Sequence, residues 1–236
     1  MTDDVSESSG DNALEERVIP LSGMKGMIAQ KMVESLSTKA QLTHQASCDV
    51  TNLMRRKTLL AEQGIKISVE DALIDAVITT IKKHPGINGY VTDKEITVLP
   101  YMHIGVAVAL EGDLLVAPAI LNADGMSLSE RALARKDVIA RARGNKLSVT
   151  EMTKGTFTLS NLGLSRVQHF TPILPAPQIG MLGIGEIRKQ YWEVESGELE
   201  IRPIMGLSLT FDHRAINGGP AADFLSDLCR TIEQDA

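Results

Sequence analysis

Cysteine is scarce in this chain of 236 residues, which has only Cys48 and Cys229. Two cysteines cannot build the disulfide framework of a small secreted domain, and free thiols are typical of a reducing compartment. Long apolar segments are also missing: no run approaches the ~20 residues that cross a bilayer, and the N-terminus has no basic and apolar signal segment. We therefore expect a soluble intracellular protein that does not associate with membranes.

A cluster of positive charge is missing as well. The chain carries 24 Lys and Arg residues against 30 Asp and Glu residues, a net charge of −6. Six of those acids and none of the bases lie in residues 1–16, so residues 17–236 are formally neutral. A neutral body without a basic cluster lacks the electrostatic footprint for nucleic acid, which is excluded as an expected partner. Because residues 1–16 show no apolar period, we predict a disordered acidic tail or linker remnant there, followed by one domain over residues 17–236.

The sequence also lacks the common metal and dinucleotide motifs. Its five histidines are His44, His84, His103, His169 and His213. None of them pairs with another at an H-x-x-x-H type of spacing, and neither cysteine completes a ligand set, so no metal site is predicted. The glycines within residues 180–185 do not form G-x-G-x-x-G before a helix, which disfavours a dinucleotide site. In a strand, such glycines indicate the close approach of another backbone or a long ligand.

Alternating helix and strand patterns predict the fold class. Apolar residues at i+4 spacing indicate a helix over residues 24–36, and strict alternation over 42–50 indicates a half-buried strand. Capping boxes that begin at Ser68 and Ser127 start two further helices, and Pro220 starts a last one. Strands are predicted at residues 104–108, 114–120, 156–161, 179–187, 190–194 and 199–211. Helices and hairpins that share one sheet predict an α/β fold, a two-layer sandwich with a mixed sheet.

His213 is the histidine with the strongest functional signal. Residues 207–220 are predicted to form a strand, a glycine-rich turn and a helix start, so the imidazole lies at a strand end beside the N–H groups of a helix N-terminus. Reactive groups of α/β proteins are common at such ends, although the pattern alone leaves a catalytic and a structural role equally open. Ser160 and Asn161 end another strand, where their polar groups either face a cleft or only cap a turn. His44 falls on the apolar face of its strand and is predicted to be a core histidine.

Three segments together resemble one family. Residues 155–163 read G-T-F-T-L-S-N-L-G, residues 182–185 read L-G-I-G, and residues 212–218 read D-H-R-A-I-N-G. They are similar to the G-T-F-T-x-S-N-x-G, L-G-x-G and D-H-R-x-x-D-G motifs in the catalytic (core) domain of the dihydrolipoamide acyltransferase family of 2-oxo acid dehydrogenase complexes. Further similar segments occur in the same order, so the resemblance covers residues 18–235.

The resemblance implies a chloramphenicol-acetyltransferase-like sandwich that forms a homo-trimer with an active-site channel at each subunit interface. Trimers of the family assemble further into cubic (24-mer) or dodecahedral (60-mer) cores, which bind the dehydrogenase components of the complex. Its members move an acyl group between dihydrolipoamide and coenzyme A, and the lipoyl-lysine arm is expected to be supplied by a lipoyl domain not present in this chain. The expected location is a bacterial or archaeal cytoplasm or the mitochondrial matrix.

The same resemblance implies roles for three residues. His213 is the expected base that takes the thiol proton, the Ser160 hydroxyl stabilises the oxyanion, and Asn217 orients the turn that carries His213. Because the family's channel lies between subunits, we expect the Ser160 and His213 of one site to come from different chains. Two positions depart from the family pattern: Asn217 stands where an Asp is usual, and Lys25 stands near the place of a usual Arg and is the expected cation facing position 217.

Two alternatives stay open beside this acyl transfer. The change from Asp to Asn at position 217 is compatible with a catalytically decayed, core-forming scaffold. A small-molecule acetyltransferase of the chloramphenicol type is disfavoured, because that family usually has a second histidine where Asp212 precedes His213. The sequence does not specify the acyl group, since acetyl, branched-chain and succinyl pockets differ by a few side chains.

Overall fold

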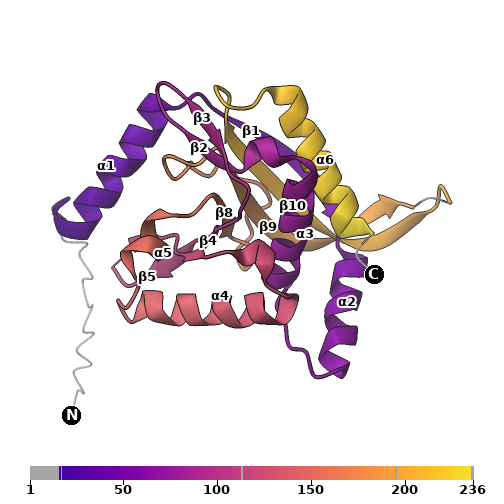
Figure 1. Ribbon diagram of the computed structural model, residues 1–236. Helices are drawn as coiled ribbons and strands as arrows, with labels where there is room; N and C mark the ends of the chain where they lie inside the picture. Colours follow the sequence, from indigo (N-terminus) through magenta and orange to yellow (C-terminus); the bar gives the residue numbers. More distant parts are fainter. Residues whose placement is uncertain (1–15, 17, 113, 195, 235–236) are drawn as a thin grey trace, which may run out of the picture.

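The structure is a computed structural model that describes residues 16, 18–112, 114–194 and 196–234 (Figure 1). The predicted acidic tail, residues 1–16, lies outside these ranges except for Glu16, so its boundary with the domain stays a prediction. The described residues form one six-stranded sheet with the strand order β1-β10-β9-β8-β4-β7, and two short separate hairpins, β2-β3 and β5-β6. The predicted α/β class with a mixed sheet is confirmed.

The elements follow the chain as predicted in their main features. The strands of the main sheet are β1 (Gln41–Asp49), β4 (Ile104–Val106), β7 (Ala119–Ile120), β8 (Phe157–Asn161), β9 (Gly180–Glu193) and β10 (Leu199–Asp212). The hairpins consist of β2 (Gly89–Val91) with β3 (Ile96–Val98), and β5 (Val108–Leu110) with β6 (Leu114–Val116). The helices are α1 (Gly23–Thr38), α2 (Thr51–Glu62), α3 (Val69–Lys83), α4 (Leu128–Arg143), α5 (Val149–Thr153) and α6 (Gly218–Glu233), with 3₁₀ turns η1 (Pro85–Ile87) and η2 (Ala123–Gly125). Among these described helices, none combines the length and apolar character required to cross a bilayer.

The two predicted capping boxes start α3 and α4. The Ser68 hydroxyl accepts a hydrogen bond from the Asp71 N–H at 3.1 Å, while the Asp71 carboxylate accepts one from the Ser68 N–H at 2.7 Å. Ser127 and Glu130 form the same reciprocal pair at the start of α4. Each pair satisfies two N–H groups that a helix start leaves without a partner, which explains why both helices begin where the sequence predicts.

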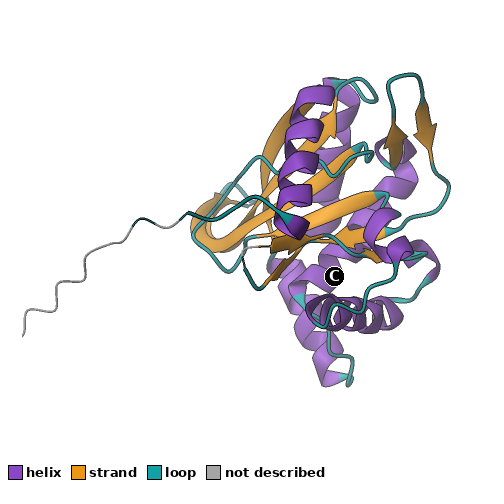
Figure 2. Ribbon diagram, turned by 90° about the vertical axis from the view of Figure 1, so that its left-hand side faces the viewer, coloured by secondary structure: helices purple, strands orange, loops and turns teal. Residues whose placement is uncertain are grey.

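Helices and one long loop lie on opposite faces of the sheet (Figures 1 and 2). The helices α3, α4 and α6 pack on one face through an apolar cluster that includes Phe157, Phe211 and Phe224. The loop 162–178 crosses the other face, where a Cβ atom on Gly185 or Gly206 would overlap the Gln168 carbonyl. Glycine in β9 therefore does permit the close approach of another backbone, as predicted. That backbone belongs to the same chain, so these glycines give no evidence of a subunit contact.

The structure differs from the prediction in several elements, and the strands predicted over residues 104–108 and 114–120 are divided among β4, β5, β6 and β7. β9 is one continuous strand that pairs with β10 along most of its length, where the sequence pattern predicted two strands. β2 and β3 are three residues long, which is too short for a periodic pattern to be recognised. α5 is absent from the prediction although it begins with a third capping box, formed by Ser148 and Glu151.

The packing of α6 on the sheet predicts the effect of one substitution. Phe224 is fully buried, and its ring lies 6.0 Å from that of Phe157 on β8. Phe224→Ala removes most of a buried aromatic ring and leaves a cavity, so it should lower the free energy of unfolding by about 3–5 kcal/mol. Urea unfolding measures the change, with Asp223→Ala on the exposed side of the same turn as the control. Equal stability of the two variants would contradict this account of the core.

Candidate active site

The turn between β10 and α6 exposes His213 and Asn217. The His213 N–H donates a hydrogen bond to the Ala40 carbonyl at 2.8 Å, which holds the backbone against the start of β1, while the imidazole remains exposed. Asn217 is the backbone N-cap residue of α6, but its side chain forms no capping hydrogen bond. Both predicted site residues therefore have side chains available to a ligand or to another chain.

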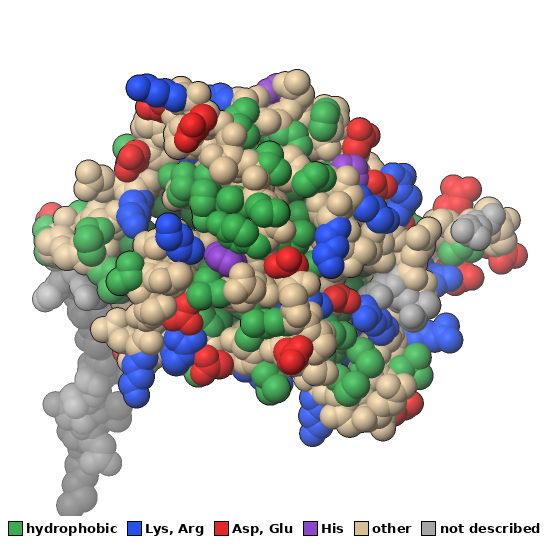
Figure 3. All heavy atoms as spheres, in the orientation of Figure 1, with side chains coloured by type: hydrophobic (Ala, Val, Ile, Leu, Met, Phe, Trp, Pro, Cys, Tyr) green, Lys and Arg blue, Asp and Glu red, His purple; other side chains and the backbone are tan. Residues whose placement is uncertain are grey.

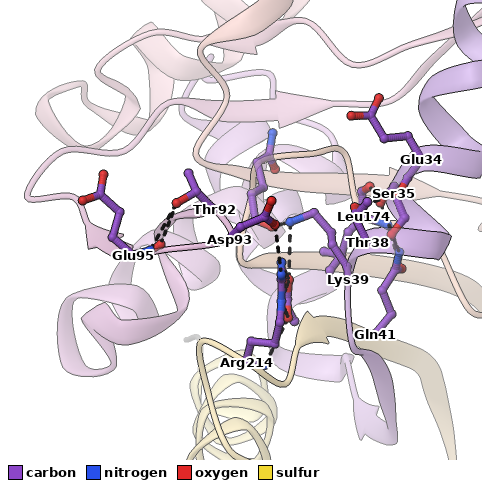
Figure 4. Close-up of polar contacts among 12 residues, drawn as sticks. Glu34, Ser35, Thr38, Lys39, Gln41, Thr92, Asp93, Glu95, Leu174 and Arg214 are labelled. Atoms are coloured by element: carbon purple, nitrogen blue, oxygen red, sulfur yellow. Dashed lines mark hydrogen bonds and ion pairs between the residues drawn. The ribbon is translucent and has the colours of Figure 1, made fainter.

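An ion network centred on a buried carboxylate anchors this turn (Figure 4). The Asp212 carboxylate is fully buried and lies 3.4 Å from the Lys39 ammonium. It also accepts hydrogen bonds from Nε and Nη2 of Arg214 at 3.0 and 2.8 Å. Arg214 reaches further to the exposed Asp93, at 3.6 Å. The two residues on either side of His213 are thus held by one carboxylate, which restricts where the imidazole can lie.

Backbone groups of Asp212 complete the turn. Its carbonyl accepts the N–H groups of Ala215 and Ile216 at 2.9 and 3.2 Å, and its own N–H donates to the Ile179 carbonyl at 2.9 Å. The carboxylate accepts the Arg214 N–H at 3.0 Å. Asp212 therefore defines both ends of the His213 turn. The resemblance marks Asp212 only as a motif residue, and Lys39 belongs to no recognised motif. The roles of both residues in holding the turn are therefore visible only in the structure.

The charge of Asp212 is stabilised in place. Burial of its carboxyl group would by itself raise the pKa, but the hydrogen bonds and charge of Arg214, together with the charge of Lys39, outweigh burial, and the pKa lies below its ordinary value. Burial is also the largest effect on Lys39, and it lowers the pKa of that ammonium against the attraction of Asp212. The hydrogen bonds to Asp212 raise the pKa of Arg214. Asp212 is therefore ionised at neutral pH and binds its two cationic neighbours.

Ser160 lies elsewhere in the chain, at the end of β8. It pairs with Gly183 of β9, and among the described residues its hydroxyl has no hydrogen-bond partner. Leu159 belongs to the apolar cluster under the helices, so alternation along the strand places Ser160 on the opposite face of the sheet. Asn161 follows, and its carboxamide oxygen accepts the Gly163 N–H at 2.8 Å. Asn161 therefore caps the turn through this oxygen, and it also lines the cavity at this end of β8.

The structure does not bring Ser160 and His213 together within one chain. Ser160 lies beside Gly183 of β9, whereas Phe211, two residues before His213, lies beside Gly180. At about 3.3 Å per residue, this register separates Ser160 and His213 by roughly 15 Å along the strands, in addition to the two strand spacings across them. A site that uses both residues requires a second chain. The separation is consistent with the prediction that the Ser160 and His213 of one site come from different chains. That sharing between chains stays a prediction.

The predicted pairing of Lys25 with Asn217 is not met within one chain. Lys25 lies in the first turn of α1, at the left edge of the coloured ribbon in Figure 1, while the first turn of α6, which follows Asn217, lies at the top. The buried cation nearest the His213 turn is Lys39, one residue beyond the end of the same helix. The direction of α1 explains why Lys39, and not Lys25, lies near the turn. The C-terminal end of α1, rather than its N-terminal end, lies beside the end of β10.

A cavity of about 500 Å³ opens near the end of β8, on the helix side of the sheet. Its lining includes Glu70, Arg135, Arg143, Asn161 and Leu164. Glu70 and Arg135 form an ion pair at 2.8 Å, whereas Arg143 has no ion pair within the described ranges. The cavity therefore has room for part of an elongated ligand and offers one guanidinium to an anionic group.

Three of the other histidines have structural partners. His84 Nε2 lies 2.5 Å from the Asp227 carboxylate, His103 Nδ1 accepts the Asn122 N–H at 3.0 Å, and His169 Nε2 lies 3.0 Å from the Ala46 carbonyl. These contacts give all three rings a structural role. His44 is only half-buried, contrary to its prediction as a core residue, and it lies near His213.

Comparison with known proteins identifies the family. The family described as 2-oxoacid dehydrogenases acyltransferase (catalytic domain) matches residues 13–236. The chain belongs to this family. Among its relatives, it is 39% identical over 224 residues to the dihydrolipoyllysine-residue acetyltransferase component of the acetoin cleaving system of Bacillus subtilis, covering 92% of this chain and 56% of the relative. It is 31% identical to the succinyltransferase component of the 2-oxoglutarate dehydrogenase complex of Azotobacter vinelandii, covering 94% of this chain and 56% of the relative.

Solved structures of acyltransferase cores share the fold. The probable dihydrolipoamide acetyltransferase of Listeria monocytogenes superimposes with a TM-score of 0.87 at 27% identity, covering 94% of this chain and 96% of that one. The dihydrolipoamide acetyltransferase of Azotobacter vinelandii gives 0.86 at 27% identity, covering 99% and 98%. A chloramphenicol acetyltransferase gives 0.55 at 14% identity, covering 93% and 98%, and confirms the predicted fold likeness alone. The chain spans about half the length of the curated relatives it matches.

The buried position of Asp212 makes its substitution informative. Asp212→Asn leaves Lys39 buried without its anion, so it should lower the free energy of unfolding by about 3–5 kcal/mol at neutral pH. The pKa of the folded carboxyl is lowered, so its stabilising effect is present above the ordinary pKa of an unfolded Asp and is lost as the pH falls toward the folded value. Urea unfolding at neutral and acidic pH measures both effects.

The control for this experiment is Asp93→Asn, which removes an exposed partner of Arg214 and should change stability little. The gap in stability between the parent and Asp212→Asn should narrow as the pH falls. A gap that is constant across the acidic range would contradict the ionic account of the turn.

Proposed function

We propose that this acyltransferase domain transfers an acyl group between dihydrolipoamide and coenzyme A. The observation that carries the proposal is the His213 turn, in which a buried carboxylate fixes the backbone on both sides of an exposed imidazole. Family membership supports the same chemistry, since the relatives are named as dihydrolipoyllysine-residue acetyl- and succinyltransferases.

The reaction needs a base because the attacking substrate is a thiol in either direction, while the acyl donor is a thioester. A thiol with a pKa of about 8.5 is mostly protonated at neutral pH, so removing its proton within hydrogen-bond reach accelerates attack. His213 takes the proton, the resulting thiolate attacks the thioester carbonyl, and a carbon–sulfur bond forms. The tetrahedral oxyanion accepts a hydrogen bond from the Ser160 hydroxyl of a neighbouring subunit. Loss of the other thiolate then breaks the original carbon–sulfur bond, and His213 returns the proton to the leaving sulfur.

Asn217 is compatible with an active enzyme. The solved Azotobacter vinelandii acetyltransferase comes from an investigation of a serine, a histidine and an asparagine in its catalytic mechanism, with the asparagine four residues after the histidine. Asn217 likewise follows His213 by four residues. The same four-residue spacing in that acetyltransferase supports an active enzyme over a decayed scaffold. We propose that Asn217 orients the His213 turn or a neighbouring chain through its free carboxamide.

The lipoyl arm and the acyl group are further parts of the proposal. We propose that a lipoyl domain outside this sequence supplies the lipoyl-lysine, and that dehydrogenase components of a 2-oxo acid dehydrogenase-type complex load it. The relatives act in different systems and include both acetyl- and succinyltransferases, so no single acyl group is favoured. The chloramphenicol type of substrate remains disfavoured by Asp212, because its buried ion network occupies the place of the second histidine.

Oligomer formation is part of the same proposal. One related solved structure is the cubic core of a pyruvate dehydrogenase complex, at a TM-score of 0.85 and 28% identity. Large apolar side chains are exposed on α1, on β3 and on the projecting end of the β9–β10 hairpin, among them Met27, Val33, Val98, Tyr191 and Ile201. Figure 3 shows apolar side chains gathered on the face over β2 and β3. Exposed apolar surface of this extent is typical of subunit interfaces, and we propose a homo-trimer as the minimal active unit.

Acyl transfer from acetyl-coenzyme A to free dihydrolipoamide tests the proposed chemistry. His213→Ala should lower the rate constant by about 10²–10⁴, as expected for loss of a general base. Ser160→Ala should lower it by about 10²–10³, as expected for loss of an oxyanion donor. Asn217→Asp should change it by less than about tenfold. A parent rate indistinguishable from that of His213→Ala would contradict the enzyme proposal and favour the scaffold alternative.

Light scattering tests the proposed assembly. At micromolar concentration the protein should have at least three times the 25.6 kDa mass of one chain. Sedimentation at several concentrations provides the control for weak association. A stable monomer that retains full acyl transfer would contradict an active site shared between subunits.

A further inference from the structure

Two imidazoles approach Gly218 from different elements. A Cβ atom on Gly218, the first residue of α6, would lie 3.8 Å from both Cε1 and Nε2 of His44 and 4.0 Å from Nε2 of His213. His44 belongs to β1 and His213 to the turn after β10. Because Gly218 has no side chain, the space between the two rings is left open on this side.

The surroundings of His44 determine which of its nitrogens faces that space. Its ring packs edge-on against Phe211, with centroids 5.0 Å apart and planes at 74°. His44 Nδ1 is buried and has no hydrogen-bond partner in the described part of the chain. A buried N–H without an acceptor is rarer in proteins than a buried lone pair without a donor, so we assign the proton of the neutral ring to Nε2. His44 thereby offers an N–H donor beside Nε2 of His213.

The buried Nδ1 of His44 has no hydrogen-bond partner, which requires an explanation. An apolar side chain could pack against Phe211 without leaving any polar atom unsatisfied. The position of Nε2 provides it: the nitrogen that is not buried lies at the space shared with the proposed base.

We propose that His44 is a second catalytic imidazole, whose Nε2–H donates a hydrogen bond to the substrate sulfur while His213 removes the proton from that sulfur. This inference rests on the proposed acyl transfer. His213 Nε2 gains the proton, the sulfur keeps the electron pair of the broken S–H bond, and the His44 N–H stabilises the thiolate without giving up its own hydrogen. When the leaving thiolate is protonated, His213 returns the same proton and His44 is unchanged.

Two substitutions at His44 separate this role from a packing role. His44→Leu removes the donor, keeps an apolar side chain against Phe211 and eliminates the unpartnered nitrogen. It should lower kcat about 10- to 100-fold, the usual effect of losing a hydrogen bond to a charged group, with little change in KM. His44→Gln keeps an N–H donor and should recover most of that loss. The thermal unfolding temperature of His44→Leu should not fall below that of the parent.

His84→Gln is the matched control, since His84 also packs against α6 but contacts Asp227 and Phe224, away from Gly218. It should leave kcat unchanged. A kcat for His44→Leu within twofold of the parent, or an equal loss in His44→Gln and His44→Leu, would overturn the inference. If the parent itself is no faster than His213→Ala, the proposed function fails instead, so the two failures are distinguishable.

A glycine pair tests the shared space independently. Gly218→Ala puts a methyl group in ordinary contact with both rings, whereas the same change at Gly219 meets nothing within 4 Å. Gly218→Ala should therefore lower kcat/KM at least tenfold with unchanged folding, and Gly219→Ala should have no effect. Equal activity of the two variants would show that no substrate group enters between His44 and His213, and would overturn the inference.

Discussion

The contact of the buried Asp212 carboxylate with the buried Lys39 and the partly exposed Arg214 is the interaction on which the proposed site depends. It joins the residue after α1, the end of β10 and the His213 turn. A buried ion pair is expensive to break from one side, because the remaining charge has no solvent to replace its partner. The network therefore restricts the His213 backbone to one position, and that is the preorganisation a general base requires.

The register of the sheet imposes the second constraint. Ser160 lies beside Gly183 of β9, whereas His213 follows the end of β10 beyond Gly180, so the two side chains lie far apart on one subunit. An acyl transfer that uses a base and an oxyanion donor within a few ångströms is thus impossible for a monomer. In the proposed oligomer, assembly would bring the two side chains together, and the exposed apolar side chains of α1 and the hairpins are surfaces available to form it.

Local sequence patterns predicted most elements, and long-range contacts account for what they did not predict. Ser68 and Ser127 start helices through reciprocal hydrogen bonds with residues three positions away, so the signal is contained in the sequence. β2 and β3 are too short to show a period, and β9 stays continuous because β10 pairs with it. Lys39 has no local signature, since its partner is 173 positions away. His44 occupies an apolar position in the alternating pattern of its strand, so the sequence predicts a core residue. Only the fold shows that its ring lies near Gly218, as the ring of His213 does.

The central claim is that one site takes Ser160 and His213 from different chains. Mixing subunits of two inactive variants tests this claim most directly. Ser160→Ala and His213→Ala subunits are co-expressed in equal amounts with different tags, and acyl transfer is measured on the doubly purified and the total protein. In a three-fold ring with random assembly, intact pairs re-form at one interface of each mixed trimer, so the total protein should recover about a quarter of the parent rate. Activity no higher than that of the two separate variants, in a sample that contains mixed oligomers, would contradict the shared site.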